Sequence, residues 1–238
     1  MKKIIFSLVA LVASMSMNAQ VMKVMKNGEV VATYEGADYE YVFEEARVST
    51  TGTAKRTGDI DVPWVQLWEN GPKFAAYNVG AANNKAEDFG GYYSWGMSID
   101  RDKASEWNKG SEILAGNNDT AIKLWGSNWR MPTKAELEAL LDNCEVTWTK
   151  VNGVSGCQCT GKGTYSANSI FFPAPGASDQ GTIVGKGESG YYWASDPGDN
   201  EYLAPNLYFC SYKGKLQDLF VSPGLRYMGQ AVRAVLAE

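Results

Sequence analysis

The segment Asp196-Pro-Gly-Asp-Asn-Glu-Tyr202 concentrates side-chain oxygens in a short, turn-prone stretch. Carboxylate and amide oxygens at close spacing are the ligands that calcium prefers, although this spacing does not follow the EF-hand pattern. A solvated turn, a calcium site and a polar rim for a glycan or protein are all compatible with the segment. The expected ligand-binding residues, which include neighbouring aromatic and amide side chains, are Tyr192, Asp196, Asp199, Asn200, Glu201, Tyr202 and Asn206.

A second segment, Gly156-Cys-Gln-Cys-Thr-Gly-Lys-Gly-Thr164, comes within one residue of a phosphate-binding loop. Gly163 stands where that motif needs Ser or Thr to bind magnesium. A phosphate-binding loop also leads into a helix whose N-terminal amides hold the phosphates, whereas a strand pattern over 169–172 follows here. The segment is therefore predicted to be a hairpin with a Gly-Lys-Gly turn and not a nucleotide site.

The chain has no histidine, which removes several kinds of catalytic centre. Ser-His-Asp and Cys-His nucleophiles and histidine-containing zinc sites all need that side chain. Glu136 and Glu138 do not replace it as an acid/base pair, because residues two apart on a helix point in different directions. We therefore expect no catalytic residue, no metal centre and no cofactor apart from calcium. An enzyme here would have to use carboxylates, Cys, Lys or Tyr.

Four cysteines leave three arrangements open; they are Cys144, Cys157, Cys159 and Cys210. They can be buried free thiols that pack like small apolar side chains. They can include one disulfide, which an exported protein permits, or they can hold a metal. Cys157 and Cys159 are two apart in a predicted strand, so they share a face and do not readily bond to each other.

Two aromatic runs, Tyr92-Tyr-Ser-Trp95 and Tyr191-Tyr-Trp193, offer the flat apolar faces on which sugar rings stack. Strand alternation divides each run between two faces of a sheet. We expect Trp95 and Trp193 to lie in the core. Tyr92 or Tyr192 is expected to face solvent, where a partner can reach it.

Two helices are predicted among the elements that must position these groups. Thr133 and Glu136 form a capping box ahead of an apolar stripe at helical spacing, which predicts a helix that begins at Thr133. A shorter helix is predicted over 119–125, with Asn118 or Asp119 as its cap.

Short strands are predicted after residue 62 from alternating β-branched and aromatic residues. They cover 65–67, 73–78, 92–95, 146–149, 157–160, 169–172, 191–194, 207–211, 216–221 and 231–235. Their connections are too short and too rich in glycine for parallel crossovers. The expected fold class is therefore α+β with antiparallel sheets.

The first residues have the order of charge and hydrophobicity that is typical of an exported protein. Lys2 and Lys3, an apolar run and small residues up to Ala19 predict a signal peptide over 1–19. The apolar run is too short to span a bilayer, and no later stretch approaches the required length. We expect a secreted protein of the periplasm or the outer cell surface, with no integral membrane segment.

Three segments are predicted after the signal. Asn27-Gly28 predicts a β-hairpin within 20–45, the polar stretch over 46–61 predicts a linker, and a single domain is expected over 62–238. Removal of the signal leaves 20 basic and 27 acidic side chains, a net charge of −7. Nucleic acid is therefore an unfavourable partner.

Seven short motifs follow one another after the predicted linker. They are Phe74-Ala-Ala-Tyr-Asn-Val-Gly-Ala, Glu87-Asp-Phe-Gly-Gly-Tyr-Tyr-Ser-Trp-Gly, Trp125-Gly-Ser-Asn-Trp-Arg-Met-Pro-Thr, Trp148-Thr-Lys-Val-Asn-Gly-Val-Ser-Gly, Ile170-Phe-Phe-Pro-Ala-Pro-Gly, Gly190-Tyr-Tyr-Trp-Ala-Ser and Val232-Arg-Ala-Val. In this order the chain resembles the Fibrobacter succinogenes major paralogous domain family of secreted bacterial proteins, over residues 62–236. Arg130-Met-Pro-Thr-Lys-Ala-Glu136 also resembles formylglycine-generating enzymes, which implies a C-type-lectin-like core of two helices and short antiparallel sheets.

The resemblance implies recognition at the cell surface and not catalysis. Formylglycine-generating enzymes use a pair of cysteines near their C-terminal end, and no cysteine follows Cys210. Calcium-dependent lectins use a Glu-Pro-Asn or Gln-Pro-Asp loop, where this chain has Ala204-Pro-Asn206. We therefore expect a non-catalytic, adhesin-like protein that presents the loops 97–118, 174–190 and 196–206 to a glycan or a surface protein.

Two other functions stay open. One is an enzyme, either a carboxylate-dependent hydrolase or a degenerate oxidase. The other is a structural or fimbrial subunit whose 21–43 hairpin adds its strands to a neighbouring chain. The oligomeric state does not follow from the sequence.

Overall fold

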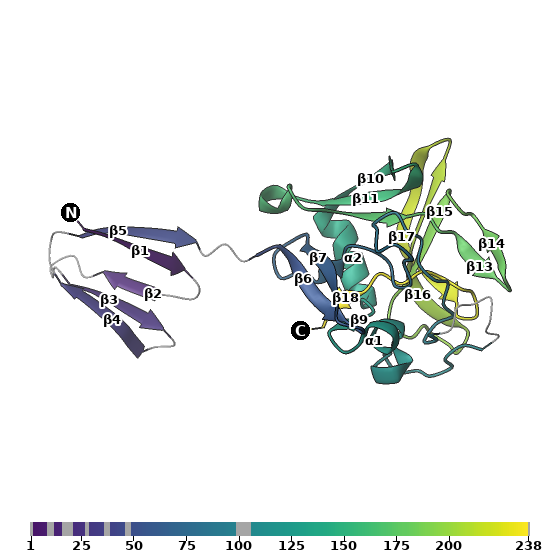
Figure 1. Cartoon of the computed structure of the whole chain (residues 1–238), viewed down its shortest axis with the longest axis horizontal. Coiled ribbons are helices and arrows are strands. Elements are labelled where there is room, and N and C mark those ends of the chain that lie inside the picture. Colours follow the sequence, from purple (N-terminus) through teal and green to yellow (C-terminus); the bar gives the residue numbers. More distant parts are fainter. Residues whose placement is uncertain are drawn as a thin grey trace. The chain divides into compact units, whose positions relative to one another are not determined.

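The computed structural model describes residues 2–8, 12–15, 21–26, 29–35, 39–45, 49–98 and 106–237. The chain forms two compact units, Met1–Ser49 and Thr50–Glu238 (Figure 1). Neither α-helix of the described residues is long and apolar enough to cross a membrane.

The described residues of the smaller unit form five strands in two sheets. β1 (Lys2–Leu8) pairs in parallel with β5 (Tyr39–Glu45), and β2 (Val12–Met15), β3 (Val21–Lys26) and β4 (Glu29–Glu35) form an antiparallel sheet. The predicted hairpin is confirmed for β3 and β4, while its turn, Asn27-Gly28, lies outside the described residues. β1 and β2 fall within the stretch predicted as a signal peptide, which stays a prediction.

The larger unit opens with a five-stranded antiparallel sheet. Its order is β6 (Thr51–Arg56), β7 (Ile60–Gln66), β8 (Lys73–Ala75), β18 (Val235–Leu236) and β9 (Trp129–Arg130).

The interpretation of 46–61 as a linker is wrong for Thr51–Arg56 and for the start of β7. β6 alternates exposed and half-buried residues and lies at the edge of its sheet, so it has no apolar face that a sequence pattern detects. Gly52 pairs with Trp64 of β7 in this strand. The Trp64 indole occupies the space where a side chain at position 52 would lie, which explains a glycine at this position.

Three further antiparallel sheets complete the larger unit. They contain β10 (Cys144–Val151), β11 (Val154–Gly161) and β12 (Ser169–Pro173); β13 (Ala177–Asp179) and β14 (Thr182–Val184); and β15 (Ser189–Trp193), β16 (Leu203–Tyr212) and β17 (Lys215–Leu225). The fold is therefore α+β, rich in sheet, and the strands of each sheet in this unit pair antiparallel. Two isolated bridges, Gly176–Gly190 and Tyr192–Ala231, are parallel.

The structure confirms one prediction about the strands and contradicts another. The near-match to a phosphate-binding loop is a hairpin connection, because β11 leads through a 3₁₀ turn, Gly163–Tyr165, into antiparallel β12. The prediction of a strand over 92–95 is wrong. Only Tyr93 makes a β-bridge, to Gln230, and the backbone turns away at Gly96 with a φ of 73°.

Both predicted helices form, as α1 (Thr120–Trp125) and α2 (Lys134–Asn143). Asp119 caps α1: its Oδ1 accepts the N–H groups of Ala121 and Ile122, at 2.8 and 3.0 Å. Its Oδ2 accepts Met131 N–H at 2.8 Å, which ties the start of α1 to the segment before α2.

The predicted capping box of α2 is also confirmed. Thr133 Oγ1 accepts Glu136 N–H at 3.2 Å, and Glu136 Oε2 accepts Thr133 N–H at 2.8 Å. Arg130 donates two hydrogen bonds to the same carboxylate. Burial disfavours the charged form of Glu136, but the bonds from Arg130 and Thr133 outweigh it and lower the pKa of that carboxyl.

Two clusters of buried side chains form the interior of the larger unit. The first core draws on α2, the β10–β12 sheet and the inner face of β15–β17. The second core is rich in tryptophan and packs on the five-stranded sheet; its indoles are Trp95, Trp125, Trp129 and Trp193. β15 contributes to both, since Tyr192 belongs to the first core and Trp193 to the second. The prediction that Trp95 and Trp193 are buried is confirmed.

Candidate functional site

The acidic segment predicted as a ligand site is a closed turn between β15 and β16. Gly198 N–H donates to Leu203 O at 3.0 Å, and Asn200 Oδ1 accepts Tyr202 N–H at 2.9 Å. Asp199, Asn200, Glu201 and Tyr202 are exposed, and the Tyr202 side chain is 54% exposed. Four of the seven predicted residues therefore reach solvent.

The other three predicted residues are held by the fold. Tyr192 is fully buried, and its hydroxyl donates to Pro173 O at 2.6 Å and accepts from Asn78. Burial raises the pKa of that phenol. Asn206 is also buried and accepts a hydrogen bond from Ser222 Oγ. Asp196 accepts the N–H of Lys134 and so caps α2.

These contacts correct the assignment of Tyr192 and Asn206 as ligand-binding residues. Strand alternation predicts one solvent face for β15, but Tyr192 and Trp193 are both buried because a core lies on each side of the strand. Tyr191 is the half-exposed tyrosine of this run, and it packs beside Tyr208 with ring centroids 4.9 Å apart and ring planes tilted by 41°.

The pocket next to the acidic turn is small, at about 160 Å³. Asp199, Lys134 and Ser222 supply its polar groups, and Pro197, Pro205 and Pro223 line much of the rest. Small-molecule sites commonly have about 300–1,000 Å³. No group of three or more His, Cys, Asp or Glu side chains in the described residues is placed to hold a metal ion. Calcium binding here stays a prediction.

Arg226, which the sequence patterns did not single out, fixes the acidic turn. Its guanidinium is buried 3.9 Å from the Trp95 ring centroid and donates to Leu203 O, Asn108 O and Gly110 O. Trp107 Nε1 donates in addition to Glu201 O at 3.2 Å. The part of the 97–118 loop from residue 106 onward therefore lies against the 196–206 loop, as a joint and rigid surface.

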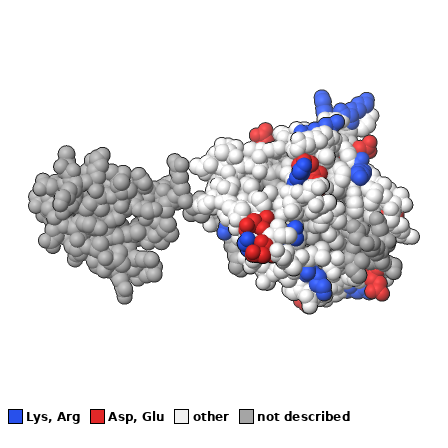
Figure 2. All heavy atoms as spheres, in the orientation of Figure 1, with Lys and Arg blue, Asp and Glu red and all other residues white. Residues whose placement is uncertain are grey.

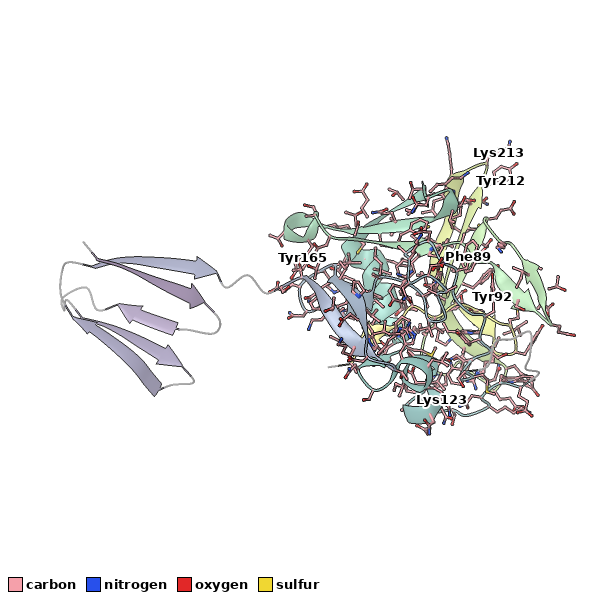
Figure 3. All side chains as sticks on the ribbon, in the orientation of Figure 1. Phe89, Tyr92, Lys123, Tyr165, Tyr212 and Lys213 are labelled. Atoms are coloured by element: carbon pink, nitrogen blue, oxygen red, sulfur yellow. The ribbon has the colours of Figure 1, made fainter. Side chains whose placement is uncertain are left out.

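A larger opening lies elsewhere, between the tips of two hairpins. It has about 520 Å³ and is lined by residues of β10–β11, of the segment before β15 and of the β16–β17 tip; these are Trp148, Lys150, Ser155, Gly187, Glu188, Ser211, Tyr212, Lys213 and Gly214. We call it the hairpin cleft. Figure 3 labels Tyr212 and Lys213 at the projecting β16–β17 tip.

Both hairpin tips are two-residue turns with positive φ angles. Asn152 and Gly153 join β10 to β11 with φ of 49° and 86°, and Lys213 and Gly214 join β16 to β17 with φ of 52° and 73°. Two consecutive positive φ angles are the geometry of type I′ turns, whose twist matches that of the paired strands. The Asn152 amide also donates to Glu87 Oε1 at 2.8 Å. Rigid local structure therefore holds both walls of the cleft.

A chain of backbone hydrogen bonds crosses the floor of the cleft. Ala174 N–H donates to Ser155 O, Gly187 N–H donates to Ala174 O, and Ser211 N–H donates to Glu188 O, all at 2.8–2.9 Å. These bonds connect the β10–β11 hairpin to β16 through the segment before β15. The backbone segments around the opening are therefore hydrogen-bonded to one another.

The side chains of the hairpin cleft combine aromatic rings with polar groups. Trp148 is half-buried and packs its ring edge-on against Phe209, at 6.2 Å. Tyr212 is 62% exposed, with Lys213 Nζ 5.1 Å from its ring centroid. Hydroxyls of Ser155 and Ser211, the Glu188 carboxylate and the Lys150 ammonium complete the lining. Rings that stack and groups that donate and accept hydrogen bonds suit a polyhydroxylated ligand.

One wall of the hairpin cleft could be predicted from the sequence. The motif from Trp148 to Gly156 carries one wall of the cleft, and its Asn152-Gly153 dipeptide is a strong hairpin indicator. The opposite wall, at 211–214, is about sixty residues away in the chain and meets it only through the tertiary fold.

All four cysteines are free thiols, so the disulfide alternative is not realised. Burial raises the pKa of Cys144 to about 11 and that of Cys157 to about 12, and it raises the pKa of Cys159 well above its usual range. Cys210 is partly exposed, and its thiol donates to Asp218 Oδ2 at 3.2 Å.

Comparisons with known proteins return no relative. No protein-family model matches the chain, and neither a curated protein nor a solved structure matches it.

Proposed function

We propose that this chain is an exported, non-catalytic recognition protein of the bacterial cell surface that binds carbohydrate in the hairpin cleft. The proposal keeps the signal peptide over 1–19, the C-type-lectin-like core and the resemblance to the major paralogous domain family as expectations from the sequence. It moves the ligand from the acidic turn to the cleft between the two hairpins.

One observation carries the proposal: a cleft of about 520 Å³ places Trp148 and Tyr212 beside hydroxyl, carboxylate and ammonium groups. Sugars present apolar C–H faces and a rim of hydroxyls, so they use aromatic stacking and hydrogen bonds together. The small pocket at the acidic turn has no aromatic ring in its lining, and its volume is about 160 Å³ against about 520 Å³ for the hairpin cleft.

The chemistry of the cleft favours binding over hydrolysis. Glycoside hydrolysis ordinarily needs two carboxyl groups that flank the scissile bond. Among the described residues that line the cleft, Glu188 is the one carboxylate. The chain also has no histidine to act as a base at neutral pH.

The test compares two exposed tyrosines, Tyr212 in the cleft and Tyr202 on the acidic turn. A buried tyrosine covers roughly 200 Å², and 62% of Tyr212 is exposed, so one face offers about 60 Å² to a sugar. At about 25 cal/mol per Å² this is about 1.5 kcal/mol, or roughly tenfold in Kd.

The experiment screens the chain from Gln20 onward on a glycan array and measures Kd for the best ligands by calorimetry. Tyr212→Ala should weaken binding about tenfold, and Tyr202→Ala should leave it unchanged. Loss of binding in Tyr202→Ala alone would place the ligand at the acidic turn. An array without any bound glycan would contradict the proposal as a whole.

A second candidate function, assembly by strand addition, is favoured by the pairing in the smaller unit. Among the described residues, β5 pairs with β1 alone, and β3 lies between β2 and β4. Cleavage after Ala19 removes both partners and leaves β3 and β5 with unpaired edges, which can accept strands of another chain. Light scattering on chains that begin at Gln20 and at Thr50 tests this. A monomer in both cases rejects assembly.

A further inference from the structure

We propose that the hairpin cleft selects acidic carbohydrates, with Lys150 and Lys213 binding a carboxylate or sulfate from opposite walls. The inference rests on the proposed function, because it names the class of sugar that the same cleft takes. Lys150 comes from β10 and Lys213 from the β16–β17 turn, so a group held by both must lie in the opening between the tips.

Neither ammonium group forms an ion pair with the described residues. The ion pairs of the described residues involve Lys55, Arg130 and Lys134, and none includes a lysine of the cleft. Lys213 lies instead over the face of Tyr212, a contact that stabilises a cation without consuming its charge. Both lysines are exposed and can form new hydrogen bonds to an anion.

The positive charge of the cleft is a local feature of an acidic chain. The whole sequence carries a net charge of −5, which by itself repels anions. At physiological ionic strength, however, charges more than about 8 Å apart are largely screened. The charged groups in the cleft therefore determine whether it attracts an anion. Figure 2 shows Lys and Arg side chains, with Asp and Glu among them, at the end of the larger unit where the hairpin tips project.

Glu188 restricts the ligand further. Its carboxylate lies in the same cleft, so it repels a second anionic group and accepts hydrogen bonds from sugar hydroxyls. The lining therefore suits a sugar with one anionic substituent and free hydroxyls, such as a uronic acid residue. A densely sulfated polymer fits it less well.

The experiment uses the chain from Gln20 onward and three uronic acid oligosaccharides, from alginate, pectin and hyaluronan. Each is compared by calorimetry with the same oligosaccharide after its carboxyl groups are reduced to alcohols. Heparin fragments serve as the densely sulfated probe. The variants are Lys150→Gln with Lys213→Gln, and Lys123→Gln as the matched control; Lys123 is an exposed lysine on α1, which Figure 3 shows at the opposite end of the unit.

We expect at least one acidic oligosaccharide to bind about tenfold more tightly than its reduced form. The double variant should remove that preference, because the loss of each exposed ion pair weakens binding by about two- to fivefold. Lys123→Gln should change nothing. At 1 M NaCl, where the Debye length is about 3 Å, the preference should disappear while binding of the neutral form persists.

Three outcomes overturn the inference. Equal binding of acidic and reduced forms, lost in Tyr212→Ala, leaves the proposed function standing and rejects acidic selectivity. A loss in Lys123→Gln as large as in the double variant shows non-specific electrostatic attraction. Tightest binding by heparin contradicts the role given to Glu188. If no probe or array glycan binds, the proposed function fails as well.

Discussion

Replacing Asp119 tests how the two helices are joined. Asp119 is 1% exposed, and its carboxylate accepts three backbone N–H groups from two separate segments. Oδ1 caps α1 through two backbone N–H groups, and Oδ2 accepts the N–H of Met131. Asp119→Asn keeps the capping oxygen and loses the acceptor for Met131, whereas Asp119→Ala loses both.

The magnitudes follow from these two contributions. Loss of an N-cap costs about 1 kcal/mol, and a buried N–H without an acceptor costs about 1–3 kcal/mol. Burial raises the pKa of Asp119, so keeping the carboxylate ionised at pH 7 costs desolvation free energy. A substitution that removes the charge also removes this cost, which offsets part of the lost stability. We expect about 1–2 kcal/mol for Asp119→Asn and about 2–3 kcal/mol for Asp119→Ala.

The assay is urea unfolding at pH 7, followed by tryptophan fluorescence. Trp125 and Trp129 lie edge to face next to this site, at 5.6 Å, and report on it directly. The matched control is Asp142→Ala, an exposed acid on α2, which should stay within about 0.5 kcal/mol. For a unit of this size the alanine variant should melt about 4–12 °C lower.

A wild-type stability in Asp119→Asn would refute the contribution of the Met131 bond. Equal effects of Asn and Ala would show that the cap contributes nothing. If Asp142→Ala were as destabilising as Asp119→Ala, the effect would come from charge and not from the buried hydrogen bonds.

Three further predictions address other parts of the larger unit. Because hydrogen bonds from Arg130 lower the pKa of Glu136, the stability that this carboxylate adds is present above about pH 4.5 and is lost as the pH falls; urea titrations of Glu136→Gln between pH 3 and 7 should therefore lack that loss. In the native protein at pH 8, iodoacetamide should modify Cys210 before the three buried cysteines, whose pKa values are raised, as measured by mass spectrometry. Gly156→Ala should cost about 1–3 kcal/mol in a thermal melt, because a methyl group would overlap the backbone of Phe172; an unchanged melting temperature would contradict that packing.

Local signals in the sequence were sufficient where one turn or one helix decides the structure. The capping box of Thr133 and Glu136 and the cap at Asp119 depend on residues a few positions apart, and both form. The same holds for the burial of Trp95 and Trp193, since large indoles rarely stay exposed in a domain of this size.

Signals failed where two distant parts of the chain determine burial. Alternation along β15 assigns Tyr192 to solvent, but whether a strand has one buried face or two depends on what packs against it. Asn206 is buried for the same reason, between β15 and β17. The hairpin cleft needs two turns about sixty residues apart to project side by side, and no local pattern encodes that distance.

The placement of β18 has a consequence for how the larger unit is made. Val235 and Leu236 sit between β8 and β9, although they follow every other described strand in the chain. A growing polypeptide that ends at residue 230 contains β8 and β9 but lacks β18, the strand that pairs with both. Phe74 and Trp129 then have no pairing partner in β18. Ribosomal synthesis must be nearly finished before this sheet can assemble. A premature stop shortly before Val235 would therefore leave β9 without its strand partner.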